Sequence, residues 1–267
     1  MTSSIRERRP ARPGVLSVAF LLGALTCAAC DDPKPAPAPV ASATASVTKT
    51  AEPPPPPDPP KPKKQVVCGT GMNAEFTDPN LEAEVRRKLQ KPTGNILVSE
   101  LKNVHTLNLA GGKVNDLDPC IFPKLLGVKD IFLGPGDLYD LSPLSGLTQL
   151  ESLRASINKV SDAAPLSHLT RMDRLDLGRT AIRDLKPIGL LVNLTELQLD
   201  DTEVNDVTPL ALCTKLEKLS LKRTQVKDLG PLRDLKKLKF LYLEGTPVDD
   251  LSPLAPLVPR GLHIVAH

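Results

Sequence analysis

LTELQLDDTEVNDVTPLALCTK, residues 194–215, is one copy of a pattern that repeats along the chain. Apolar side chains recur in it at fixed places, namely Leu194, Leu197, Leu199, Val204, Val207 and Leu210. Seven copies begin at Val104, Val128, Leu150, Met172, Leu194, Leu216 and Leu238. The first copy is two residues longer, and the others follow one another every 22 residues. A fixed period of this length predicts a solenoid, because one unit cannot bury its leucines alone while a stack of units can.

Within each copy, the residue types predict a strand, a turn, a short 3₁₀-like segment and a return. Leu197 and Leu199 alternate with polar residues, which places both on the inner face of a short strand. Strands of successive copies should pair side by side, about 4.8 Å apart, in a parallel sheet with one exposed face. A proline such as Pro209 fits the first helical turn, where its missing N–H does no harm.

An aspartate stands three residues before that proline in every copy. It suits the N-cap of the helical turn, where its carboxylate would accept a backbone N–H. Because the position recurs seven times, we interpret these acids as caps and not as catalytic groups. The predicted caps are Asp116, Asp140, Asp162, Asp184, Asp206, Asp228 and Asp250.

The pattern L-x-x-L-x-L-x-x-N-x-I-x-D-L-x-P-L resembles the leucine-rich repeat, in the 22-residue class found in bacterial internalins and in a phosphatase regulator. The resemblance covers about 155 residues. It implies an α/β solenoid, a horseshoe with a parallel β-sheet on the concave face and 3₁₀ or short helical turns on the convex face. In this family the concave face commonly binds proteins. The chain departs from the family by having threonine where asparagine usually builds a buried ladder. A hydroxyl offers one donor and an amide two, so we expect a weaker ladder in the same fold.

An N-terminal helical cap is predicted over residues 68–100, ahead of the repeats at 101–267. Asp78 suits an N-cap and Pro79 the first helical position, while Leu81, Val85 and Leu89 share one face. This segment resembles the cap found before many bacterial leucine-rich repeats. At the other end, a truncated last strand comes one residue short of the register. We expect its edge to be open to pairing, including pairing with a second copy of the chain.

Residues 1–29 resemble an export signal, with a basic start, an apolar run and small residues before Cys30. The signal resembles a bacterial lipobox, which implies lipidation of Cys30. Ordinary cleavage near Ala29, giving a secreted protein, is the alternative. Residues 30–67 are rich in proline and predict a disordered, extended linker. We therefore expect an exported protein held on a bacterial membrane, facing the periplasm or the cell surface.

The remaining cysteines have two interpretations. In an oxidising compartment, Cys68 and Cys120 could form a disulfide between the cap and the first repeat. Alternatively, Cys120 simply fills an apolar position that other copies give to leucine or isoleucine. Cys213 is expected to be a lone thiol in a turn.

Charge and motifs exclude several function classes. The formal net charge of +3 comes from residues 1–29, where four arginines face one glutamate, and the remainder is neutral. We therefore expect no nucleic-acid partner, since that binding needs a clustered basic surface. The four histidines are not spaced for a metal site, and no nucleophile or phosphate-loop motif is present. The sequence indicates a protein without enzymatic activity, cofactor or metal.

Specificity should therefore come from the exposed strand positions of the concave face. Opposite charges on neighbouring strands are expected to pair there: Arg154 with Asp176, Glu196 with Arg174 and Lys218, and Lys222 with Asp200 and Glu244. Aromatic and arginine side chains often dominate interfaces. We expect Tyr242 to contact a partner and Phe240 to pack on the C-terminal segment. The candidate ligand-binding residues are Phe132, Arg154, Asp176, Gln198, Phe240 and Tyr242.

These features support the hypothesis of a non-catalytic protein-binding module displayed on the cell envelope. Its partner would be a protein of unknown identity, with an envelope polysaccharide as the less favoured ligand. Two other function classes remain open. One is a structural or self-associating spacer, and the other is a regulator of a phosphatase, which the export signal disfavours.

Overall fold

The computed structural model describes residues 67–266. The signal at 1–29, the lipidation site Cys30 and all but the last residue of the 30–67 linker lie outside these described residues. Within 67–266, no helix is long and apolar enough to cross a membrane.

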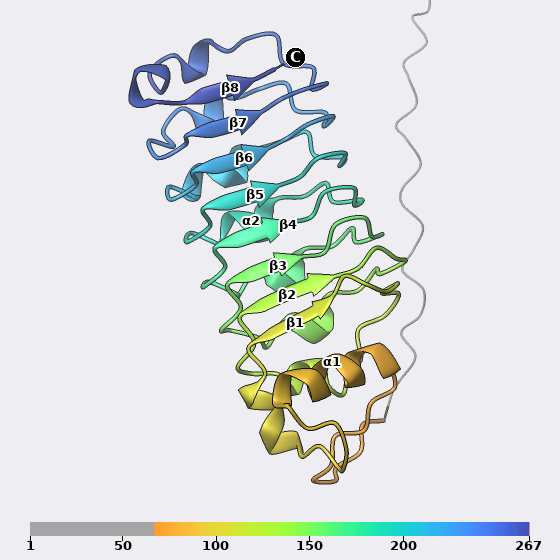
Figure 1. Cartoon of the computed structure of the whole chain (residues 1–267). Helices are drawn as coiled ribbons and strands as arrows, with labels where there is room; N and C mark the ends of the chain where they lie inside the picture. The colour runs from red at the N-terminus through yellow and green to blue at the C-terminus, as the bar shows by residue number, and fades with distance from the viewer. Residues whose placement is uncertain (1–66, 267) are drawn as a thin grey trace, which may run out of the picture. The chain divides into compact units, whose positions relative to one another are not determined.

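An eight-stranded parallel sheet organises the repeats, with its strands in sequence order (Figure 1). The strands are β1 (Thr106–Leu109), β2 (Asp130–Leu133), β3 (Ser152–Arg154), β4 (Arg174–Asp176), β5 (Glu196–Gln198), β6 (Lys218–Ser220), β7 (Phe240–Tyr242) and β8 (His263–Val265). The predicted leucine-rich repeat solenoid is confirmed. The expectation for the last strand needs correction, because Leu241 of β7 pairs with Ile264 of β8. The spacing between β7 and β8 is therefore one residue longer than the repeat, whereas the sequence predicted a spacing one residue shorter.

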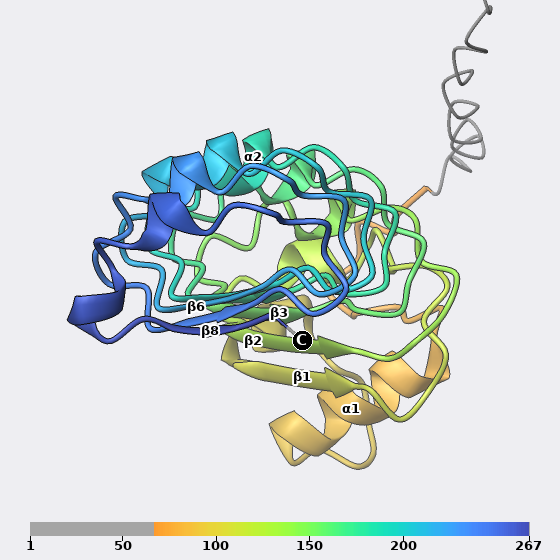
Figure 2. The same cartoon turned by 90° about the horizontal axis from the view of Figure 1, so that it is seen from above.

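Short helical segments cover the side of the stack opposite the sheet (Figure 2). Most are single 3₁₀ turns, and α2 is one short α-helical turn. They are η2 (Phe122–Lys124), η3 (Ser142–Leu144), η4 (Ala164–Leu166), α2 (Lys186–Gly189), η5 (Thr208–Leu212), η6 (Gly230–Leu232), η7 (Ser252–Leu254) and η8 (Val258–Arg260). Between these turns and the sheet, the repeated leucines form one continuous core.

The repeated aspartates bond as expected but stand one residue earlier than a true N-cap. Oδ1 of Asp206 accepts a hydrogen bond from the Thr208 N–H at 2.8 Å, while the N-cap of η5 is Val207. This is an Asx-turn that leads into the helical segment. The same bond is made by Asp140, Asp162, Asp184, Asp228 and Asp250.

The first copy differs from this pattern. Asp116 is exposed, and Asp118 instead accepts the N–H bonds of Cys120 at 2.8 Å and Ile121 at 3.2 Å. The first copy has two extra residues, which shift the turn along the chain by the same amount. The role predicted for Asp116 thus belongs to Asp118.

The buried ladder shows how threonine differs from asparagine. The Asn158 amide donates to the Gly134 carbonyl of the preceding repeat at 3.1 Å, and its oxygen accepts the Leu138 N–H at 3.3 Å. Thr180 donates a single bond to Leu177 in its own repeat. Thr202 and Thr224 do the same within theirs. Of the four threonines, Thr246 reaches the preceding repeat, through the Leu221 carbonyl. Three threonines therefore close a turn without joining two repeats.

The predicted N-terminal helix is α1 (Pro79–Leu89), followed by the 3₁₀ segment η1 (Val98–Asn103). Asp78 caps α1 by accepting the Asn80 N–H at 2.8 Å, as expected. Leu81 and Val85 are buried, and Leu89 packs against the core from a half-buried position. The helix therefore covers the leucines of the first repeat.

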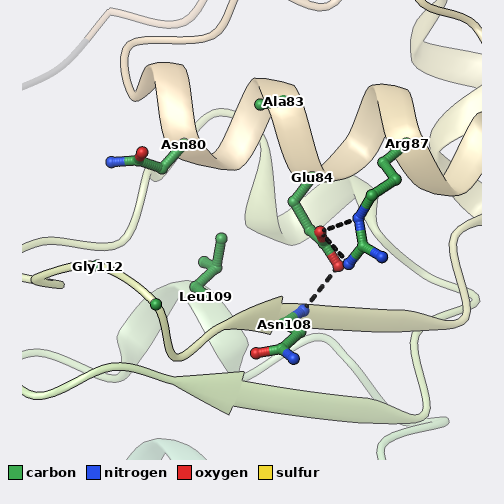
Figure 3. Close-up of a pocket in the computed structure, with 8 residues that line it drawn as sticks. Asn80, Ala83, Glu84, Arg87, Asn108, Leu109 and Gly112 are labelled. Carbon is green, nitrogen blue, oxygen red and sulfur yellow. Dashed lines mark hydrogen bonds and ion pairs between the residues drawn. The ribbon is translucent and has the colours of Figure 1, made fainter.

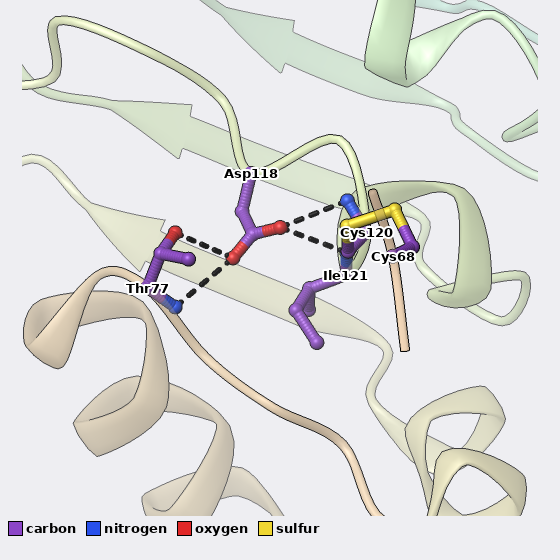
Figure 4. Close-up of a disulfide and its surroundings, with 5 residues drawn as sticks. All are labelled: Cys68, Thr77, Asp118, Cys120 and Ile121. Carbon is purple, nitrogen blue, oxygen red and sulfur yellow. Dashed lines mark hydrogen bonds between the residues drawn. A yellow bond between two sulfur atoms is a disulfide. The ribbon is translucent and has the colours of Figure 1, made fainter. Parts of the chain in front are cut away.

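A disulfide joins Cys68, ahead of α1, to Cys120 in the first repeat (Figure 4). Beside it, Asp118 accepts bonds from the Thr77 hydroxyl at 2.8 Å and the Thr77 N–H at 3.1 Å. The same carboxylate holds the turn of the first repeat, so covalent and polar contacts fix the cap in one place. Cys213 is a free thiol as predicted. It is buried, and this burial raises the pKa of the thiol to about 11.

Candidate functional site

The candidate site is the exposed face of the sheet, here called the open sheet face. It carries the side chains that alternate with the buried leucines, arranged in rows by the strand register. The first row consists of Thr106, Asp130, Ser152, Arg174, Glu196, Lys218, Phe240 and His263. The middle row consists of Asn108, Phe132, Arg154, Asp176, Gln198, Ser220, Tyr242 and Val265.

Five of the six predicted binding residues lie in the middle row, and Phe240 lies in the first row. Phe132, Arg154, Asp176 and Gln198 are brought together on four consecutive strands. Tyr242 is separated from Gln198 by Ser220. The predicted residues thus share one face but do not form one contiguous cluster.

Arg154 and Asp176 form the predicted ion pair, with 3.0 Å between Nε and Oδ2. The other carboxylate oxygen of Asp176 accepts the Gly178 N–H at 3.0 Å. The aspartate is therefore fixed by its own turn and holds the arginine in place. An exposed pair of this kind contributes about 0–1 kcal/mol to stability, so its main effect is orientation.

Lys222 is the centre of a second cluster. Its ammonium lies 2.8 Å from Glu244 Oε1 and 4.9 Å from the centroid of the Tyr242 ring. The hydrogen bond with Glu244 raises the pKa of Lys222, and the same bond lowers the pKa of Glu244. A cation over an aromatic face is attracted by the ring quadrupole. Tyr242 is thus held by a lysine that sequence reasoning had considered only for its charge.

The ion pair predicted between Asp200 and the Lys222 ammonium is not found among the described residues. Asp200 accepts a hydrogen bond from the Ser220 hydroxyl and another from the Lys222 main-chain N–H at 3.1 Å. Ser220 is buried, so its hydroxyl needs a partner, and Asp200 supplies one.

The charges predicted to cancel around Glu196 do not do so. Arg174 Nε lies 3.5 Å from Asp173, its neighbour in sequence. Within residues 67–266, no ion pair joins Glu196 to Arg174 or to Lys218, although the strand register places both beside it. The nearby carboxylate of Asp173 competes for Arg174, an interaction that strand register alone does not reveal.

Phe240 packs on the C-terminal segment, as predicted. Its ring stacks on that of His263 in β8, with centroids 5.7 Å apart and planes inclined by 19°. The outer side of Phe240 remains open, because 43% of the residue is exposed. The end of the first row therefore presents a fixed aromatic surface.

A shallow groove of about 240 Å³ lies between α1 and β1 (Figure 3). The carboxylate of Glu84 is buried beneath it, 2.9 Å from Arg87 Nε and 3.0 Å from the Asn108 main-chain nitrogen. Its burial between helix and strand could not be inferred from helical periodicity. Among the described side chains, no cluster of His, Cys, Asp and Glu could hold a metal ion.

Residues 214–256 match the family model for leucine-rich repeats in two copies. The structure is similar to internalin C2 of Listeria monocytogenes, with 28% sequence identity and a TM-score of 0.65. That match covers 72% of this chain and 94% of the other. No curated protein sequence matches the chain.

A second Listeria monocytogenes internalin, inlF, has 30% identity and a TM-score of 0.65, covering 71% of this chain and 56% of that protein. A leucine-rich repeat protein of Leptospira interrogans has the same fold at 21% identity, with a TM-score of 0.51. It covers 62% of this chain and 50% of its own. The chain thus contains leucine-rich repeats and has an internalin-like solenoid fold, a fold that suggests a protein-binding repeat module.

Proposed function

We propose that the protein is a non-catalytic binding module whose open sheet face takes a protein partner. The observation that carries this proposal is that the side chains of each strand alternate between two environments, the core and the exposed face. The leucines are committed to the core, while polar and aromatic side chains stand on a hydrogen-bonded sheet that holds them in register. Aromatic and arginine anchors on a rigid surface are typical of protein interfaces.

A protein suits this face better than an envelope polysaccharide. Charged groups of both signs, such as Arg154, Glu196 and Lys218, are spread along the sheet, and a protein can offer both signs in return. Electrostatic complementarity of that kind gives specificity and favourable orientation.

Capture experiments test the face directly. The purified chain would be immobilised and exposed to envelope extract from the source bacterium, and bound proteins would be identified by mass spectrometry. Replacing Arg154 and Tyr242 with alanine should reduce recovery of a specific protein, while the control Arg183→Ala on the solenoid flank should not. Unchanged recovery with the double variant would contradict the proposed face.

We place the protein in the cell envelope, held by a lipid on Cys30 and spaced from the membrane by the proline-rich linker. The disulfide between Cys68 and Cys120 supports an oxidising compartment, because such bonds persist mainly outside the cytosol. Metabolic labelling with an alkyne fatty acid should mark the wild-type chain and leave Cys30→Ser unlabelled. Equal absence of label in both, with the chain in the medium, would instead indicate secretion.

Self-association remains a second candidate function. Within the described residues, β8 has a neighbouring strand on one side only, and its last residue, Val265, is 40% exposed. An edge of this kind can pair with another strand. Light scattering across a concentration series would support self-association if the mass doubled, and a constant monomer mass would exclude it.

A further inference from the structure

The first row of the open sheet face differs from the middle row in the pairing of its charged side chains. Arg154 and Asp176 neutralise each other in the middle row, and Tyr242 is covered by Lys222. In the first row, Glu196 on β5 and Lys218 on β6 lie side by side. Within residues 67–266, neither forms an ion pair. The charges of Glu196 and Lys218 therefore remain available for contacts with another molecule, whereas Arg174 of the same row pairs with Asp173.

An aromatic surface continues this row. Lys218 is in register with Phe240 on β7, and Phe240 is in register with His263 on β8. The stacking of Phe240 on His263 fixes the ring, so little side-chain entropy is lost when a partner covers it. Acid, base and aromatic ring thus occupy three consecutive strands in fixed order.

We propose that Glu196, Lys218 and Phe240 form the specificity-determining strip of the protein-binding face. The strip fits a protein segment with a basic side chain opposite Glu196, a carboxylate opposite Lys218 and an apolar side chain on Phe240. This inference rests on the proposed function and deepens it, because it names the row and the chemistry of the partner. It moves the centre of recognition from the middle row, predicted from the sequence, to the first row.

Like charges brought together across an interface disfavour the wrong partner strongly, while opposite charges orient the right one. Sequences with the reverse charge order are therefore excluded by the same two residues that favour the correct order. The middle row then adds further contacts with the partner beside this strip.

A selection experiment on the full chain tests this strip. Random 16-residue peptides displayed on phage would be selected on the wild-type protein, and enriched peptides would be synthesised for fluorescence anisotropy. We expect a basic, an acidic and an aromatic residue in the enriched sequences. Their affinity should fall at least about tenfold for the exchange variant E196K/K218E, which keeps the net charge, and for Phe240→Ala.

The control variant R183E/E203R exchanges an exposed ion pair of 2.8 Å on the solenoid flank. It should leave the affinity unchanged. Circular dichroism and Tm measurements confirm that all variants are folded. Selection on E196K/K218E should in turn enrich peptides of the opposite charge order.

The possible outcomes separate this inference from the proposed function. Peptides that lose affinity for Arg154→Ala or Tyr242→Ala but bind E196K/K218E normally would overturn the strip and leave the binding face intact. Peptides indifferent to substitutions in both rows would contradict both proposals. Failure to enrich any peptide would likewise count against both.

Discussion

The carboxylate of Glu84 accepts a hydrogen bond from the main-chain N–H of Asn108, at 3.0 Å. Asn108 lies in β1, the first strand of the sheet, so no earlier strand can accept this N–H. A side chain of the cap helix therefore completes the backbone hydrogen bonding of the sheet. Arg87 and Lys88 lie near the same carboxylate, at 2.5 and 3.8 Å, which compensates its charge in a buried place.

Removing this carboxylate should destabilise the cap. We expect Glu84→Ala to lower the free energy of unfolding by about 1–3 kcal/mol, because the Asn108 N–H is left without its partner. Urea denaturation followed by circular dichroism measures this change. Glu82→Ala is the control, since Glu82 forms a partly exposed ion pair with Arg86 on the same helix, and it should cost no more than about 0.5 kcal/mol. Equal costs for both variants would mean that the contact with β1 contributes nothing.

The disulfide joins Cys68 and Cys120, which are 52 positions apart in the sequence. Cross-linking a loop of this length stabilises a fold by about 2–4 kcal/mol, mainly by restricting the unfolded chain. We expect Cys68→Ser to lower Tm by several degrees in thermal melts. Dithiothreitol should lower the Tm of the wild type to a similar value and leave that of Cys68→Ser unchanged. A wild-type melt unaffected by reductant would show that the bond does not form.

Cys213 should be unreactive in the folded protein. Its pKa is raised to about 11 by burial, so at pH 8 only about one molecule in a thousand carries the nucleophilic thiolate. Titration with Ellman's reagent should detect this thiol in guanidinium chloride and not in native buffer. Rapid reaction of the native chain would contradict its burial, and Cys213→Ala supplies the blank.

Asp206 should contribute to stability only above acidic pH. Two hydrogen bonds lower the pKa of Asp206 in the folded protein. The bond from the Thr208 hydroxyl has the larger effect, and the bond from the Thr208 N–H has the smaller one. A depressed folded pKa gives stability above the unfolded pKa of about 3.9, which is lost as pH falls through the folded value. We expect Asp206→Ala to cost about 0.5–2 kcal/mol at pH 7, and the difference from wild type to shrink toward pH 3.

Asp116→Ala is the matched control for that measurement, because Asp116 is exposed and Asp118 holds the first turn. Its cost at pH 7 should be within about 0.5 kcal/mol of zero, as for most surface substitutions. A cost as large as that of Asp206→Ala would restore the role that the sequence pattern assigned to it.

The fold could be predicted because it depends on residues that recur. Seven copies of one leucine pattern predict the strand, the turn and the stacking of the repeats. An irregularity in one copy does not change this prediction, because the other copies support it. Individual side chains have no such support. The two extra residues of the first copy moved its turn from Asp116 to Asp118, and the register could not show that Arg174 would lie closer to Asp173 than to Glu196.

The sequence predicted which residues lie on the candidate face, because leucines and polar residues alternate along each strand and only the leucines face the core. Its internal pairing was predictable only in part. Arg154 with Asp176 and Lys222 with Glu244 pair across neighbouring repeats as expected. The bond between Ser220 and Asp200 and the burial of Glu84 depend on side-chain directions and on the cap, which no repeat pattern contains.

Site-specific photocrosslinking in living cells tests the central claim most directly. A benzoylphenylalanine would replace Gln198 on the open sheet face or, in a second strain, Leu212, which is 60% exposed in η5 on the opposite side. The account predicts a discrete higher-mass protein adduct after irradiation at position 198 and none at position 212. An adduct at position 212 alone, or at neither position, would contradict binding through the sheet.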